Sequence, residues 1–122
     1  MPVDFELAPE IQDVRNRVRT FMDDEVRPME EKLSSNGADR NAYRMEIGRL
    51  RERAKELGLW NPHMPPEWDG MGLGPVAMAF VSAEAGRTGI GPFVLNASAP
   101  DEGNMHTLLH AATDAQKEKY LR

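Results

Sequence analysis

His106 and His110 stand four residues apart, a spacing that places two possible metal ligands on one face of a helix. The helix of a metalloprotease has Glu directly after its first His, and this sequence has Thr107 there. Glu102 and Asp114 continue the same face, but they allow at most a weak, adventitious site, because no further ligand follows at a known spacing. The pattern therefore predicts a polar helix face and no metal ligands.

Glycines crowd the stretch "DGMGLG" at residues 69–74, directly before an apolar run. Glycines ahead of a helix can let backbone N–H groups approach a phosphate. A dinucleotide-binding loop, however, follows a hydrophobic strand and has the spacing G-x-G-x-x-G. Here "PPEW" precedes the spacing G-x-G-x-G, and no phosphate-loop lysine is present. We expect a tight, packed corner, with Trp60 and Trp68 as its anchors and no cofactor-binding residues.

Nucleophilic and acid–base catalysis have little support in the sequence. Ser98 lies near Asp101 and His106, but no nucleophile elbow or oxyanion loop surrounds it. The carboxylate pairs at 23–24 and 30–31 are typical of solvated helix faces. The residues alone form no complete catalytic site, so we predict no catalytic residues and an inactive chain when it is isolated.

These residues must be positioned by helices, the first of which is predicted over residues 7–29. Apolar side chains recur there at steps of three and four, with charged residues between them. Pro9 suits the first turn, where a missing N–H costs nothing. Pro28 is expected to kink or stop the helix, because its ring clashes with the carbonyl of Asp24. Residues 34–37, "SSNG", are predicted to be a loop.

Two further helices follow in the middle of the chain. One begins after Asp39, whose side chain can cap it. It ends at Gly58, because the position after a helix often has a left-handed backbone conformation that glycine adopts easily. The next begins at Pro75 and is apolar on nearly every face, so we expect it to be central and closely packed by its neighbours. The residues expected to end it are Gly86, Gly89 and Gly91.

The last third of the sequence also reads as helical. Residues 92–99 fit a strand or a helix, and the helical context favours a helix. An apolar stripe over residues 105–112 predicts another helix. Thr113 and Gln116 form a capping box that opens a final one. The fold class expected is all-α, a single domain over residues 1–122 with five or six helices.

The final helix has barely two turns before Arg122. Helices that short are marginal by themselves, and Tyr120 and Leu121 are expected to have little to bury against. We therefore expect the chain to be the front end of something longer.

Composition sets outer limits on function. Of the 122 residues, 40% are hydrophobic, which is enough for a core, and the net charge of −5 argues against nucleic acid or an anionic membrane as main partner. Cysteine is absent, which excludes disulfides and thiolate chemistry. The start "MPVDFELAPE" lacks a basic, apolar targeting segment, and no apolar run is long enough to span a membrane. We expect a cytoplasmic protein.

Several of these pieces together resemble one known family. They are the helix end "LGL" at 57–59, the corner "PEWDGMGLG" at 66–74, Glu84 in the following helix, "GN" at 103–104 and "DAQKEKYL" at 114–121. In this order and spacing they resemble the N-terminal domain of the acyl-CoA dehydrogenase family. The segment "SAPDEGNM" at 98–105 is most similar to the branch of family members 10 and 11.

The resemblance implies a larger flavoenzyme. The family joins an N-terminal helical domain to a middle β-domain and a C-terminal helical bundle, both of which would lie beyond Arg122. FAD, the flavin-contacting strands and the catalytic carboxylate base belong to those parts. The reaction, as in fatty acid β-oxidation, removes a proton from the α-carbon and a hydride from the β-carbon of an acyl-CoA. Electron-transfer flavoprotein would be the redox partner, and the parent would be a homo-oligomer.

The role that the resemblance implies for this domain is to form one wall of the acyl pocket. By resemblance the substrate-binding residues are Leu95, Asn96, Ala99, Pro100 and Gly103. The corner at 66–74 would then be a rigid turn into a central helix.

The sequence also departs from the family pattern in two places. Where many members have paired glutamates in the central helix, this chain has Ala83 and Glu84, and Pro100 puts a rigid kink in the pocket segment. The alternative function is a stand-alone helical interaction module derived from the same domain.

Overall fold

The computed structural model describes residues 5–122, so the first four residues of the predicted domain lie outside it. Within that range every regular element is helical and there is no strand. The elements are α1 (Pro9–Phe21), a π-helical segment (Met22–Val26), α2 (Arg27–Ser35), α3 (Arg40–Glu56), a 3₁₀ turn (Pro66–Trp68), α4 (Pro75–Ala85), α5 (Gly91–Val94), α6 (Asp101–Ala111) and α7 (Asp114–Tyr120). Because α1, the π-helical segment and α2 run on as one helix, six helices result, and the all-α prediction is confirmed.

The sequence predicted that Pro28 would kink or stop the first helix. The helix does not stop there but continues to Ser35. The π-helical segment directly before Pro28 explains this difference. In it the N–H of Arg27 reaches the carbonyl of Met22, five residues back instead of four, which widens the helix. Pro28 then occupies the first turn of α2, where a missing N–H costs no helical hydrogen bond. The loop predicted for residues 34–37 is correspondingly shifted: Ser34 and Ser35 are helical, and the loop covers residues 36–39.

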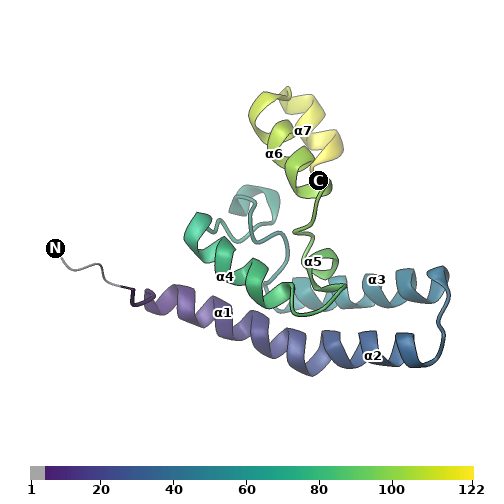
Figure 1. The fold of residues 1–122 in the computed structure, drawn as a ribbon. Helices are drawn as coiled ribbons and strands as arrows, with labels where there is room; N and C mark the ends of the chain where they lie inside the picture. The colour runs from purple at the N-terminus through teal and green to yellow at the C-terminus, as the bar shows by residue number, and fades with distance from the viewer. Residues whose placement is uncertain (1–4) are drawn as a thin grey trace.

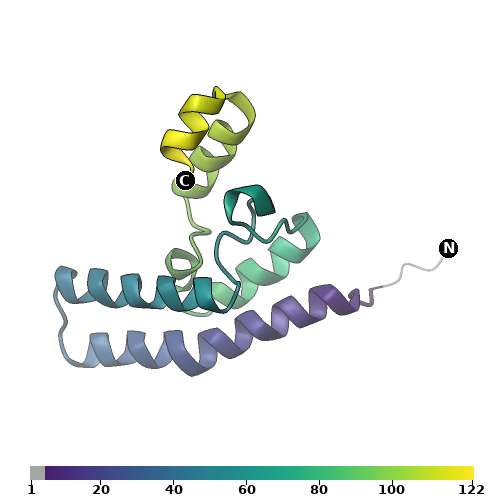
Figure 2. The same ribbon diagram turned by 180° about the vertical axis from the view of Figure 1, so that it is seen from behind.

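The helices form a layered body with a projecting hairpin. The long α1–α2 helix packs against α4 along its α1 half, and its α2 half lies antiparallel to α3 (Figure 1). Helices α6 and α7 pack on each other and stand away from this body, as the reverse view confirms (Figure 2). Asp39 caps α3 as predicted, since its Oδ1 accepts the N–H of Ala42 at 2.9 Å.

The hydrophobic core lies between the α1–α2 helix, α3, α4 and α5. Its most deeply buried side chains include Met22, Val26, Ala54, Val81 and Leu95, none of which is more than 1% exposed. Burial of such side chains is the main favourable term in folding, worth about 1.5–3 kcal/mol for each large aliphatic group.

Helix α4 is buried on one face only. Ala77, Val81 and Ala85 pack toward the core, whereas Val76 on the opposite face is 60% exposed. The expectation that neighbours enclose this helix is therefore not met within residues 5–122. Its main packing partner is α1, so nothing in the described chain covers its outer apolar face.

The C-terminal third follows the sequence prediction with two differences. Helix α5 is a single turn of four residues, so the helix favoured for 92–99 covers only part of that range. The capping box of α7 is present, with Thr113 Oγ1 accepting from Gln116 N and Gln116 Oε1 accepting from Thr113 N. Leu121 was expected to have little to bury against, but it is only 9% exposed. The neighbouring Arg122 lies over the ring of Trp68 at 5.2 Å, so the end of the chain contacts the corner at 66–74. None of the helices in residues 5–122 has the length and apolar character needed to cross a bilayer.

Candidate functional site

The five residues expected to bind substrate lie in and around the link from α5 to α6, but they differ in exposure. Leu95 has no exposed surface and belongs to the hydrophobic core. Asn96 is half-buried, while Ala99, Pro100 and Gly103 are exposed. The segment therefore has a buried anchor at its start and an open surface of small residues at its end.

Asn96 fixes the start of this link to the loop after α3. Its backbone has a left-handed conformation, with φ of 56°, and its side-chain amide donates to Asn61 Oδ1 at 2.7 Å. Asn61 is itself left-handed, with φ of 48°, and its N–H donates to the carbonyl of Leu95 at 3.1 Å. Asparagine tolerates this conformation better than most residues, which explains its use at both positions.

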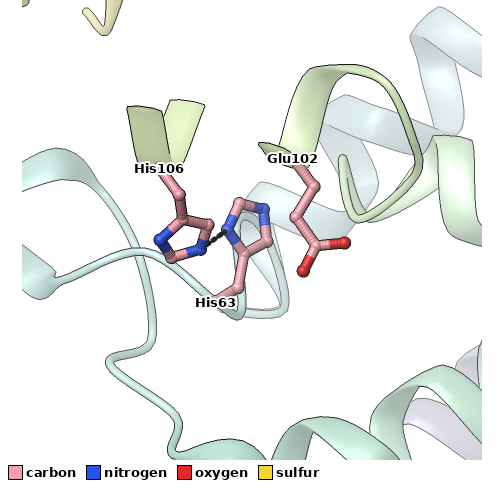
Figure 3. A group of neighbouring side chains, drawn as sticks. All are labelled: His63, Glu102 and His106. Atoms are coloured by element: carbon pink, nitrogen blue, oxygen red, sulfur yellow. Dashed lines mark hydrogen bonds between the residues drawn. The ribbon is translucent and has the colours of Figure 1, made fainter. Parts of the chain in front are cut away.

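A histidine from the same loop reaches the link as well. His63 is 8% exposed, and its Nε2 lies 2.9 Å from the carbonyl oxygen of Asn96. A carbonyl only accepts hydrogen bonds, so Nε2 must hold the hydrogen, and Nδ1 of the neutral ring is left with a lone pair. That lone pair accepts from His106 Nε2 at 3.0 Å (Figure 3).

The structure thus gives His106 a different partner from the one that sequence spacing indicated. His110 stacks beside His106 with ring centroids 6.3 Å apart, but the hydrogen bond goes to His63. His63, Glu102 and His106 offer three ligand atoms within 4.8 Å of one another. Sequence analysis missed His63 because it lies 43 residues from His106 and in the proline-rich loop.

The glycine-rich corner is packed, as the sequence predicted. A Cβ at Gly70 would lie only 1.9 Å from the carbonyl oxygen of Met64, and Gly72 has φ of +65°. The N–H of Gly72 donates to that same Met64 carbonyl at 2.8 Å, so the corner folds back on its own first residues. Gly70 and Gly72 are therefore needed for close approach and for backbone angle.

A cavity beside this corner was not anticipated from the sequence. It has a volume of about 580 Å³ and is lined by residues that include Trp60, Asn61, Met71 and Leu121. None of the five expected substrate-binding residues lines it. Lys55, which also lines the cavity, lies over the ring of Trp60 at 4.9 Å from its centroid.

Glu84, the acidic residue of α4, is buried and held by two arginines. Arg19 on α1 and Arg87 after α4 both donate to its carboxylate. The hydrogen bonds from Arg19 are the largest influence on the pKa of Glu84 and lower it, although burial opposes the shift. Asp23 joins the same network through Arg87, so this residue is not the purely solvated carboxylate expected from its sequence context.

Comparison with known proteins identifies the class of this domain. The model of the acyl-CoA dehydrogenase N-terminal domain matches residues 8–122. The chain belongs to the acyl-CoA dehydrogenase family, and the resemblance seen in its motifs is confirmed.

Individual relatives agree with this assignment. Acyl-CoA dehydrogenase family member 11 of Mus musculus is 35% identical over 116 residues, which cover 90% of this chain and 14% of that protein. Family member 10 of the same organism is 34% identical over 122 residues, covering 94% of this chain and 11% of that protein. Both belong to the branch indicated by the sequence.

A solved structure supports the fold. The structure of a "putative acyl-CoA dehydrogenase" from Mycobacterium abscessus superposes with a TM-score of 0.80 at 32% identity, over 96% of this chain and 31% of that chain. The present chain thus spans about a third or less of these relatives and of this structure.

Proposed function

We propose that this chain is the N-terminal helical domain of a flavin-dependent acyl-CoA dehydrogenase, which would desaturate an acyl-CoA thioester between its α- and β-carbons. The observation that supports this most is the domain match over residues 8–122, together with the small share of each relative's length that the chain spans. Relatives named as acyl-CoA dehydrogenases contain a domain of this kind within a much longer chain.

The contribution proposed for this domain is one wall of the acyl pocket. Ala99, Pro100 and Gly103 are exposed and small, so an acyl chain can lie against them without displacing side chains. Leu95 and Asn96 would act as positioning residues, because the first is fixed in the core and the second is hydrogen-bonded to Asn61. The exposed segment would thereby be held in place from its buried end.

The remaining parts of the activity are assigned to residues outside this chain. FAD and the catalytic base would be supplied by the other domains, so the isolated chain should be inactive. Electron-transfer flavoprotein is the proposed oxidant of the reduced enzyme, the parent is proposed to be a homo-oligomer, and the cytoplasm is its proposed location. The apolar outer face of α4, with Val76 60% exposed, is available for contact with those domains.

A stand-alone interaction module is the second candidate. The same exposed face of α4 would suit it, since unpartnered apolar surface often marks a contact site. The two functions differ in whether flavin and acyl-CoA chemistry accompany the domain in the complete protein.

The test compares the complete gene product with the 122-residue chain. We expect the complete protein to hold FAD and to reduce an artificial electron acceptor when an acyl-CoA is added. The isolated chain should leave the fluorescence of added FAD unchanged. A complete protein without flavin and without acyl-CoA-dependent reduction would contradict the enzyme assignment and favour the interaction module.

A further inference from the structure

Three side chains from two separate segments converge at the junction between the loop after α3 and helix α6. His63 comes from the loop, while Glu102 and His106 stand one turn apart on α6 (Figure 3). We propose that they form a binding site for a divalent transition-metal ion of the zinc type. This inference does not rest on the proposed dehydrogenase function.

The two imidazoles already have nearly the separation that a metal requires. His63 Nδ1 and His106 Nε2 lie 3.0 Å apart. A tetrahedral Zn²⁺ with bonds of about 2.0–2.1 Å to nitrogen holds two such atoms about 3.3 Å apart. A metal can therefore replace the hydrogen between the two nitrogens with only a small movement of either ring.

The orientation of His63 is fixed by an outer partner. Its Nε2–H donates to the carbonyl of Asn96, which leaves the Nδ1 lone pair directed at His106. Metal-binding histidines typically donate their second N–H to a carbonyl or carboxylate in this way, because that bond sets both the tautomer and the ring angle. Asn96 is in turn held by Asn61, so this ligand is preorganised.

Glu102 supplies the third donor. It precedes His106 by one helical turn and is half-buried, and its carboxylate has no hydrogen bond or ion pair within residues 5–122. Its oxygen lies within 4.8 Å of a nitrogen of each histidine. Rotation about its side-chain bonds has to bring that oxygen at most about 1.5 Å closer to reach ligand geometry.

The donor set selects the kind of metal. Two neutral imidazoles and one carboxylate suit Zn²⁺ and its neighbours in the transition series, whereas Ca²⁺ and Mg²⁺ prefer sites built of oxygen. A fourth position would remain for water. The bound ion would tie α6, and with it the α6–α7 hairpin, to the loop at 61–64.

The helical pair His106 and His110 is the competing site. Both sites use His106, so a variant at that position cannot separate them. His63→Gln removes a ligand of the proposed site alone, and His110→Gln removes a ligand of the helical pair alone. These two substitutions are therefore matched controls for each other.

Isothermal titration of the 122-residue chain with ZnCl₂ tests the proposal. We expect one ion per chain, binding at least about tenfold weaker in His63→Gln and in Glu102→Gln, and unchanged binding in His110→Gln. Zn²⁺ should also raise the melting temperature of the wild type and of His110→Gln, but not that of His63→Gln. CaCl₂ and MgCl₂ should produce neither effect.

Two results would overturn the site. One is the absence of saturable Zn²⁺ binding to the wild-type chain. The other is binding that survives His63→Gln and disappears in His110→Gln, which would assign the metal to the helical pair. If circular dichroism shows that His63→Gln fails to fold, Glu102→Gln decides instead, since the Glu102 carboxylate has no hydrogen bond or ion pair within residues 5–122.

Discussion

Arg19 on α1 and Glu84 on α4 form a two-point ion pair, with Nε to Oε2 at 3.1 Å and Nη2 to Oε1 at 2.6 Å. The Glu84 side chain is 8% exposed and that of Arg19 is 48% exposed, so the pair sits at the edge of the core. It joins two helices through residues that are 65 positions apart in the sequence. The network extends through Arg87, which contacts both Glu84 and Asp23.

This pair predicts a loss of stability in acid. The pKa of Glu84 in the folded chain lies below its ordinary value of 4.5, chiefly because of the hydrogen bonds from Arg19. A group with a lowered folded pKa stabilises the fold above its unfolded pKa, and this contribution is lost as the pH falls through the folded pKa. Glu84→Gln should therefore cost about 1–3 kcal/mol at neutral pH, less than for a fully enclosed pair, and progressively less below about pH 4.5.

Urea unfolding of both proteins at several pH values measures this difference. Glu118 is a suitable comparison, because Arg122 also lowers its pKa although its side chain is 57% exposed. Glu118→Gln should change the pH dependence much less, since exposed ion pairs contribute little. Equal and constant effects of the two substitutions at every pH would contradict this explanation.

Replacing glycine by alanine should change the free energy of unfolding in opposite directions at two positions. Gly72 has φ of +65°, where a Cβ is strained, so Gly72→Ala should lower the free energy of unfolding by about 1–2 kcal/mol. Gly48 lies inside α3 with open space around its missing Cβ. Gly48→Ala should raise the stability by about 0.5–1 kcal/mol.

Thermal and chemical melts of these variants, each with and without CoA, distinguish a packed corner from a phosphate site. The packed corner predicts the same loss in Gly72→Ala whether or not CoA is present. Stabilisation of the wild-type chain by CoA that disappears in Gly72→Ala would contradict it.

The capping box of α7 should be needed for the order of that helix. Thr113→Ala removes the hydroxyl that accepts from Gln116 N at 3.3 Å, and should cost about 0.5–2 kcal/mol. Thr107→Ala is the control, because the Thr107 hydroxyl only donates back to the carbonyl of Gly103 within α6. Hydrogen exchange of the α7 amides should accelerate in the first variant and not in the second. Unchanged exchange in Thr113→Ala would mean that packing of Leu121 alone holds the helix.

Local spacing predicted much of this fold. The cap at Asp39, the box at Thr113 and the packed glycine corner depend on residues a few positions apart, so sequence alone shows them. The continuation of the first helix past Pro28 was missed, because the π-helical segment that accommodates it has no comparable sequence signal. The incomplete cover of α4 was missed because an apolar helix does not reveal where its neighbours lie.

The sites depend on longer separations and were harder to predict. The hydrogen bond between His63 and His106 spans 43 residues, and that between Asn61 and Asn96 spans 35. Spacing along one helix drew attention only to His106 and His110, which the sequence analysis interpreted as a polar helix face. Their rings stack, but within residues 5–122 they share no hydrogen bond. The family resemblance predicted substrate contacts for the link between α5 and α6 as a whole, whereas only the structure separates its buried start from its exposed end.

Gly103 provides the most direct test of the pocket-wall proposal. It is exposed on α6, nothing lies within 4 Å of the position a Cβ would take, and a helical glycine is readily replaced, so Gly103→Leu should fold. In the complete gene product we would measure kcat/KM for acyl-CoA substrates of increasing chain length, with Gly48→Leu, at an exposed position of α3, as the control. If Gly103 lines the acyl pocket, its Leu variant should lower kcat/KM for the longest accepted chains at least about tenfold relative to the shortest, while Gly48→Leu leaves the profile unchanged. A chain-length profile of Gly103→Leu identical to that of the wild type would contradict the account.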